Sequence, residues 1–238
     1  MADLTQFEIT PYSENAILVK WPSVISAVLH QRLIAISSQV AELKPWFIEQ
    51  VCSYHSLLIY YRFEAISAAE FSAKVANIIE HHSNQEFSAD LTGKTITIDV
   101  LYNHQSGWDN ALLCQEKNCT LEDIIKWHTG RSYRAYALGF TPGFCYLASV
   151  DEKLSIPRKT VPRKRVPAGA VAIAHKQTAI YPDSSPGGWH IIGQTAQPMY
   201  QMTNNEFTPL INVGDIVTFK AVSQEDFIAQ GGKLIKEY

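Results

Sequence analysis

The chain has 238 residues, of which 46% are hydrophobic and 18% charged, and its formal net charge is −3. A chain of this length can bury about 70 to 75% of its unfolded surface, which suffices for one large domain or two modest ones. The composition is typical of an ordinary globular protein, and the weak negative charge excludes a global attraction to nucleic acid or to anionic membranes. Because no apolar run approaches the 18 or so residues of a membrane span, and no secretory pattern precedes Phe7, we expect a cytoplasmic protein.

The four cysteines are not spaced like metal ligands or a redox motif. Cys52, Cys114, Cys119 and Cys145 include no CxxC pair, and no second pair or suitably spaced histidines accompany the 114/119 pair. Intracellular proteins rarely carry structural disulfides. The pattern therefore predicts reduced thiols and no metal site.

The first ninety residues alternate between strand and helix patterns. Residues 7–21 predict two short strands around a turn at 13–15, and the aromatic and aliphatic residues of 46–63 predict further strands. Apolar residues at steps of three and four over 25–43 predict an amphipathic helix that Ser23 caps and Pro45 ends. The same spacing over 71–82 predicts a second helix. This order favours a small α+β domain, ferredoxin-like, over residues 1–90.

The pattern changes after a polar stretch at residues 81–93, which is the best candidate for a linker between a domain at 1–90 and a second at 91–238. Alternating isoleucine and valine at 96–100 predict a strand, and Thr120 opens a predicted helix that reaches His128. His128 lies on the apolar face of that helix, so we expect it to pack in the core. From residue 133 onward, short strands broken by proline and glycine predict a mainly β domain with a closed antiparallel sheet.

Residues 139–195 concentrate the turn-forming and basic residues of the chain. Six lysines and arginines fall within residues 153–165, and Pro157, Pro162 and Pro167 recur among them at five-residue spacing. Proline at this density prevents a helix and disfavours a central strand. We therefore expect an extended, ordered surface loop. On it, Arg158 and Arg163 could bind a carboxylate or phosphate through their planar guanidinium groups, or simply form a solvated basic surface.

Two turns on either side of this loop could form the walls of a binding pocket. Pro142 and Gly143 predict a tight turn that presents aromatic rings, either to a pocket or to a packed barrel corner. The turn at Pro186 to His190 combines paired glycines, which allow close approach of the backbone, with a large anchoring ring and a titratable imidazole; a tight turn around a core tryptophan is the simpler alternative. The residues concerned are Phe140, Phe144, Tyr146, Gly187, Gly188, Trp189 and His190, with Tyr181 in a polar cluster beside the second turn.

The familiar catalytic signatures are absent from the sequence. The segment Gly231-Gly232-Lys233 lacks the first glycine and the final Ser or Thr of a P-loop, and there is no GxSxG, HExxH or EF-hand pattern. No methionine lies between lysine and alanine, as a biotin attachment site requires. Catalytic residues are therefore not identified from the sequence.

Residues 139–195 resemble the N-terminal half of the carboxyltransferase-like proteins, also called the allophanate hydrolase subunit 1 family. Weaker similarity extends over nearly the whole chain. The resemblance rests on many residues at fixed spacings: Gly139-Phe140, Pro142-Gly143-Phe144, Tyr146-Leu147, Pro157-Arg158, Pro162-Arg163, Val166-Pro167-Ala168-Gly169, Gln177-Thr178, Tyr181-Pro182, Pro186-Gly187-Gly188-Trp189 and Ile192-Gly193.

The resemblance implies a cyclophilin-like barrel at 91–238 and an activity that belongs to an assembly. That activity is the ATP-dependent conversion of 5-oxo-L-proline to L-glutamate by a 5-oxoprolinase, in which this chain would work with a homologous C subunit and a separate A subunit. ATP would be bound by the assembled complex, and the chain alone would be inactive. Two alternatives remain open: inhibition of a sensor histidine kinase by direct binding, and biotin-dependent carboxyl transfer to a urea-like substrate.

Overall fold

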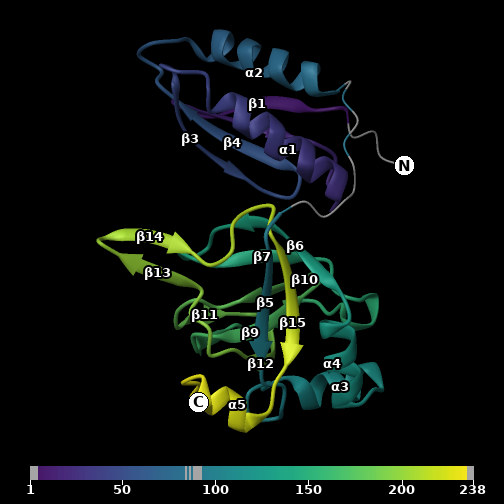
Figure 1. Cartoon of the computed structure of the whole chain (residues 1–238). Helices are drawn as coiled ribbons and strands as arrows, with labels where there is room; N and C mark the ends of the chain where they lie inside the picture. Colours follow the sequence, from purple (N-terminus) through teal and green to yellow (C-terminus); the bar gives the residue numbers. More distant parts are fainter. Residues whose placement is uncertain (1–4, 84, 86, 88–92, 235–238) are drawn as a thin grey trace. The chain divides into compact units, whose positions relative to one another are not determined.

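A computed structural model describes residues 5–83, 85, 87 and 93–234 (Figure 1). The chain divides into two compact units, Met1–Leu91 and Thr92–Tyr238. Much of the linker predicted at 81–93 lies outside the described residues. None of the described helices is both long enough and apolar enough to cross a membrane.

The first unit is a four-stranded antiparallel sheet with two helices packed on it. The sheet has the order β1-β2-β4-β3, and β4 buries every second residue, as expected for a strand with one face toward a core. The helices contact each other and bury Leu33, Ile36, Phe71 and Val75 with the strands. Its elements are β1 (Glu8–Ser13), β2 (Ala16–Lys20), α1 (Ala27–Val40), β3 (Phe47–Cys52), β4 (Ser56–Tyr61) and α2 (Ala68–Ser83).

The predicted start of α1 was wrong by three residues. The hydroxyl of Ser26, and not that of Ser23, accepts the backbone N–H of Leu29 and so caps the helix. Ser23 lies before the helix, where its hydroxyl is 3.2 Å from Nε2 of His55. The two serines lie on either side of Ile25, the first apolar residue of the predicted stripe, so the sequence pattern alone does not decide which one caps.

The ferredoxin-like topology of the first unit stays a prediction. In that topology a fourth strand follows the second helix and pairs beside the first strand. In this unit β2 corresponds to that first strand. The strand that pairs at its outer edge is β1, which precedes β2 in the chain and does not follow α2. In the part of the chain that the structure describes, α2 is the last element of this unit.

The second unit is built on a seven-stranded sheet of order β12-β9-β10-β7-β6-β15-β5. Leu101, just after β5, exchanges two backbone hydrogen bonds of 2.8 and 3.0 Å with Gln194 at the end of β12, so the sheet is a nearly closed barrel. The prediction of an antiparallel sheet was wrong at one position, because β5 and β15 run parallel. The strands of the barrel are β5 (Thr95–Val100), β6 (Ser132–Leu138), β7 (Cys145–Ala148), β9 (Ala170–Ala174), β10 (Gln177–Ile180), β12 (His190–Gln194) and β15 (Ile216–Ala221).

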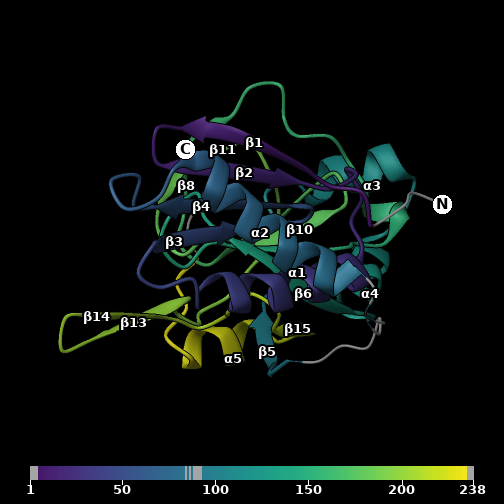
Figure 2. The same ribbon diagram turned by 90° about the horizontal axis from the view of Figure 1, so that it is seen from above.

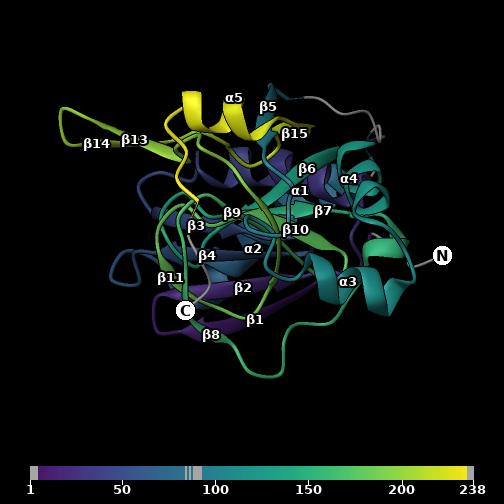
Figure 3. The ribbon, with the colours of Figure 1, turned by 90° about the horizontal axis from the view of Figure 1, so that it is seen from below.

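Short elements surround the barrel. Figures 2 and 3 show the hairpin β13–β14 projecting on one side of the barrel and helices α3 and α4 lying on the opposite side. A separate two-stranded sheet, β8 with β11, carries part of the basic segment. These elements are α3 (Asn110–Lys117), α4 (Leu121–Thr129), η1 (Glu152–Leu154), β8 (Arg163–Val166), β11 (Ser185–Gly187), β13 (Tyr200–Thr203), β14 (Glu206–Pro209) and α5 (Gln224–Ala229).

Helix α4 and His128 follow the sequence prediction. Thr120 and Asp123 form a capping box at the start of the helix. His128 is fully buried in the barrel core, where Tyr102 donates its hydroxyl proton to Nδ1 at 2.7 Å and Nε2 donates to Thr178 at 2.9 Å. Burial lowers the pKa of His128 to about 3. His128 is therefore a neutral core residue, as predicted.

The cysteines are free thiols, as predicted. Cys145 is buried in the barrel and the other three are half-buried. Burial raises the pKa of Cys52 to about 12, so this thiol carries little nucleophilic thiolate near neutral pH.

Candidate functional site

The residues singled out on both sides of the basic loop surround a pocket of about 270 Å³ on the second unit. It lies between the segment that leads into β7, the loop before β8, and the turn from β11 into β12. The lining residues are Phe140, Phe144, Tyr146, Arg158, Lys159, Pro162, Tyr181, Pro186, Gly187, Gly188 and Trp189. Four predicted site residues, Pro142, Gly143, Arg163 and His190, adjoin this lining in sequence without belonging to it.

The wall of the pocket is an aromatic cluster centred on Phe144. Its ring centroid lies 5.4 Å from that of Tyr181 and 6.0 Å from that of Trp189, at interplanar angles of 82° and 87°. Tyr146 completes the cluster with its centroid 4.9 Å from Phe144. These edge-to-face contacts stabilise the arrangement beyond simple burial. Phe144, Tyr181 and Trp189 are buried, so the wall is rigid.

Phe140 forms the exposed edge of this wall, with its ring centroid 5.3 Å from that of Phe144. Its side chain is 60% exposed and its backbone has φ of +76°, a left-handed conformation that costs a bulky residue about 1 kcal/mol or more. Gly143, in the same turn, has φ of +82°, which glycine adopts without strain. The turn holds an apolar ring in solvent beside the pocket.

The paired glycines have different roles. A Cβ atom at Gly187 would lie only 2.1 Å from the hydroxyl oxygen of Tyr181, so only glycine fits there. That hydroxyl also accepts the backbone N–H of Trp189, which fixes the tyrosine ring. A Cβ at Gly188 would meet Pro162 and the carbonyl oxygen of Lys159 at 3.6 Å, an ordinary contact distance. Gly187 is required by packing, whereas Gly188 leaves space at the pocket lining.

Arg158 brings positive charge to the pocket. Its guanidinium carbon lies 5.7 Å from the centre of the Trp189 ring, a cation–π contact. Burial raises the pKa of Tyr146 and that of Tyr181, the latter to about 12, and the charge of Arg158 acts against both shifts. Arg158 thus lines the same pocket as both tyrosines.

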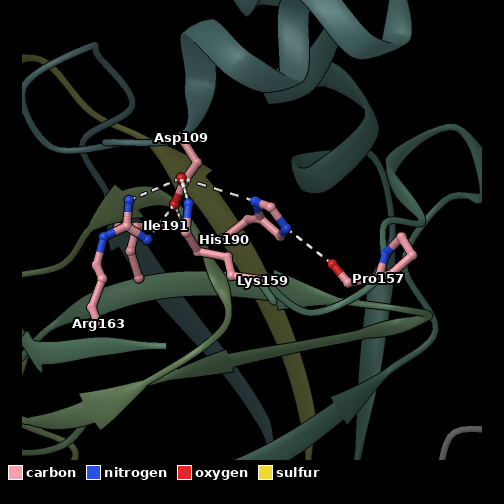
Figure 4. A network of polar contacts seen from close by, with 6 residues as sticks. All are labelled: Asp109, Pro157, Lys159, Arg163, His190 and Ile191. Atoms are coloured by element: carbon pink, nitrogen blue, oxygen red, sulfur yellow. Dashed lines mark hydrogen bonds and ion pairs between the residues drawn. The ribbon is translucent and has the colours of Figure 1, made fainter. Parts of the chain in front are cut away.

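Arg163, the other predicted anion ligand, is engaged by a carboxylate that the sequence did not single out (Figure 4). Asp109 accepts hydrogen bonds from both terminal nitrogens of Arg163 at 2.9 Å, from Nζ of Lys159 at 2.7 Å, and from the backbone N–H of Ile191 at 2.7 Å. The side chain of Asp109 is 3% exposed and that of Arg163 is 12% exposed. The guanidinium of Arg163 also lies 5.5 Å from the Trp108 ring centre. Anion binding by Arg163 stays a prediction.

This network fixes the basic loop to the barrel. Burial raises the pKa of Asp109, but the hydrogen bonds from Arg163, Lys159 and Ile191 outweigh burial and hold the pKa below its usual value. Asp109 therefore stays ionised at neutral pH. Lys159 and Arg163 lie on either side of Pro162, which lines the pocket. Ile191 lies on β12 of the barrel. The carboxylate of Asp109 therefore links the loop beside the pocket to the barrel sheet.

His190 supports the same loop. Its Nε2 donates to the carbonyl oxygen of Pro157 at 2.9 Å, and its Nδ1 lies 3.9 Å from Oδ1 of Asp109 (Figure 4). Burial lowers the pKa of His190, although Asp109 and the Pro157 carbonyl act in the opposite direction. A neutral imidazole protonated on Nε2 fits these contacts, so His190 here positions the loop backbone.

The pocket as described is suited to binding. Its lining contains no serine, cysteine, aspartate or glutamate that could act as a nucleophile or carboxylate base. In the neighbouring polar cluster, Asp183 accepts the hydroxyl of Tyr200 and Ser184 accepts from Arg165. The fold and the site thus define a β-barrel protein with a small aromatic pocket bordered by a basic loop.

Comparison with known proteins places the chain in a family. The model of the carboxyltransferase domain, subdomain C and D, matches residues 7–210. The chain therefore belongs to the carboxyltransferase domain C and D family, and the resemblance noted in the sequence is confirmed.

Two relatives match over nearly their whole length. The chain is 28% identical over 232 residues to the B subunit of 5-oxoprolinase from Bacillus subtilis (strain 168), covering 94% of this chain and 96% of the relative. It is 34% identical over 211 residues to the 5-oxoprolinase B subunit of Haemophilus influenzae, covering 89% and 96%.

Two solved structures are similar but belong to longer chains. The structure of a protein designated TTHA0988 is 30% identical with a TM-score of 0.73, and the match covers 88% of this chain and 40% of that one. The urea amidolyase of K. lactis is 14% identical with a TM-score of 0.75, and the match covers 100% of this chain and 16% of that one. The second likeness shows the fold alone.

Proposed function

We propose that this chain is a subunit of an ATP-hydrolysing 5-oxoprolinase that converts 5-oxo-L-proline to L-glutamate. The observation that carries the proposal is the match to relatives named as the B subunit of 5-oxoprolinase, over 96% of their length. The substrate, the nucleotide and the partners are part of the proposal. We expect the partners to be a homologous C subunit and a separate A subunit.

The character of the pocket supports a role within an assembly. It has rigid aromatic walls and an arginine, but among the described residues that line it there is no serine, cysteine or carboxylate side chain. A binding surface of this kind becomes an active site when a second chain adds the missing groups. In the 30%-identical TTHA0988 structure, the matching region is 40% of a longer chain, so further polypeptide accompanies this fold there.

The reaction requires activation of an unreactive amide. In the route we propose, the lactam oxygen of 5-oxoproline attacks the γ-phosphorus of ATP, and ADP leaves. Water then attacks the activated ring carbon, the C–N bond breaks and the nitrogen takes up a proton, which gives an acyl phosphate of glutamate. A second water hydrolyses this acyl phosphate to glutamate and inorganic phosphate. Cationic groups stabilise the charge that develops on the transferred phosphoryl group and on the carbonyl oxygen.

The proposal is tested by reconstitution. The chain is purified alone and together with homologues of the A and C subunits, and ADP release is measured with and without 5-oxoproline. We expect ADP release that depends on 5-oxoproline, equals glutamate formation, and requires this chain. An assembled complex without 5-oxoproline-dependent ADP release, or a complex equally active when this chain is omitted, would contradict the proposal.

The two alternatives from the sequence stay predictions. The likeness to urea amidolyase is a likeness of fold at 14% identity, so it adds nothing specific for carboxyl transfer. Kinase inhibition has no observation in its favour beyond the family resemblance.

A further inference from the structure

The charges around the pocket are distributed unequally. Two of the three nearby cations, Lys159 and Arg163, are bound to Asp109 at 2.7 and 2.9 Å. For Arg158, within the described part of the chain, we find only the contact with Trp189 and long-range effects on two tyrosines. A ligand anion can therefore pair with the Arg158 guanidinium without first breaking an ion pair.

The dimensions of the pocket limit the ligand. Pockets for drug-sized ligands have volumes of about 300 to 1,000 Å³, and this one has about 270 Å³. A single five- or six-membered ring with one or two substituents fits that space, whereas a whole nucleotide would extend out of it. The walls formed by Phe144, Tyr146 and Trp189 favour a flat or apolar ring face.

The polar groups at the lining match a ring carbonyl as well as an anion. Tyr146 and Tyr181 each carry a hydroxyl that can donate a hydrogen bond to a carbonyl oxygen. Both phenols are protonated near neutral pH, and burial raises their pKa further. A guanidinium is suited to a carboxylate because its planar N–H groups bind two oxygens at once.

We propose that this pocket binds a small cyclic carboxylate, with Arg158 pairing with the carboxylate, the aromatic wall holding the ring, and Tyr146 or Tyr181 donating to a ring carbonyl. Asp109 is a positioning residue in this site: it holds Lys159 and Arg163, and through them the loop that carries Arg158. The inference deepens the proposed function and rests on it only for the choice of 5-oxoproline as the probe.

The test measures binding by the full chain, using calorimetry with 5-oxoproline, its uncharged amide 5-oxoprolinamide, and inorganic phosphate. A charge-assisted hydrogen bond corresponds to about a ten- to hundredfold change in affinity, so we expect the amide to bind weaker by that factor. Arg158→Gln should weaken binding of the acid to the level of the amide and leave the amide unaffected. Lys164→Gln, at an exposed lysine on β8, is the matched control and should change neither affinity.

A second variant tests the pocket itself. Gly188→Ala adds a methyl group at the lining with no contact shorter than 3.6 Å, so the fold tolerates it. It should weaken the acid and the amide by the same factor, because it removes space and not charge. The two variants therefore separate recognition of charge from recognition of shape.

The outcomes distinguish this inference from the proposed function. If Arg158→Gln leaves the preference for acid over amide unchanged, if phosphate binds as tightly as 5-oxoproline, or if neither the chain nor the complex binds 5-oxoproline, the ligand assignment is wrong. If the reconstituted complex hydrolyses 5-oxoproline with unchanged KM in Arg158→Gln, the site is wrong and the function stands. If the chain binds 5-oxoproline through Arg158 but the complex releases no ADP, the site stands and the function is wrong.

Discussion

Replacing Asp109 with asparagine should destabilise the second unit more than any comparable change at an exposed ion pair. Each oxygen of Asp109 accepts two hydrogen bonds: Oδ1 from Arg163 and Lys159, and Oδ2 from Arg163 and the backbone N–H of Ile191. Asparagine has one oxygen and one NH₂ group. In either orientation of the amide, the NH₂ group must face two donors, and two partly buried cations lose their counter-charge.

The magnitude follows from burial. Removing one partner of a buried ion pair costs about 3 to 5 kcal/mol. The Lys159 side chain is 24% exposed, so water compensates part of its loss, and we expect about 3 kcal/mol. Asp151→Asn is the control: its pair with Arg131 is also 2.7 Å long, but the side chains are 28% and 38% exposed, and such pairs contribute about 1 kcal/mol or less.

The assay is urea denaturation of the full chain, combined with hydrogen exchange of peptides from 157–167 and from β12. Asp109→Asn should lower the urea concentration at the unfolding midpoint and speed hydrogen exchange in both peptides. Asp151→Asn should do neither. Because the pKa of Asp109 is lowered in the fold, its contribution is present above the unfolded pKa of about 4 and is lost as pH falls through the folded pKa. Equal stability of the two variants, or unchanged exchange at 157–167, would refute the assignment of Asp109 as the anchor of the loop.

Two further predictions test the core and the paired glycines. The ring protons of His128 should show no titration by NMR between pH 8 and pH 5, because its pKa is about 3; the stability that neutral His128 contributes is complete above pH 6.5 and falls by about 1.4 kcal/mol per pH unit from there toward pH 3. A titration midpoint near 6.5 would contradict the buried assignment. Gly187→Ala should cost about 1 to 3 kcal/mol in urea denaturation, since its Cβ would lie 2.1 Å from the Tyr181 hydroxyl, whereas Gly188→Ala should cost about 0.5 kcal/mol or less. Similar costs at both glycines would show that the Tyr181 ring can move away.

The sequence determined the features that depend on local pattern or on clustered residues. Helices with a long apolar stripe, the cap at Thr120 and the buried character of His128 follow from spacing, because neighbours three and four residues apart share a helix face. The aromatic and glycine residues of the pocket were identified because they lie in one dense stretch of turns. Helices α3 and α5 were not predicted: at eight and six residues they are too short to show a period.

The tertiary structure alone decided what charge the pocket presents. Asp109 is 50 residues before Lys159, 54 before Arg163 and 82 before Ile191, and no local pattern marks it as their partner. The sequence shows two similar arginines on one loop, but the fold brings a buried carboxylate to Arg163 and an indole ring to Arg158. Ion pairing depends on distances of a few ångströms between residues distant in the chain, so these roles could be separated only once the barrel placed β12 and the loop before α3 side by side.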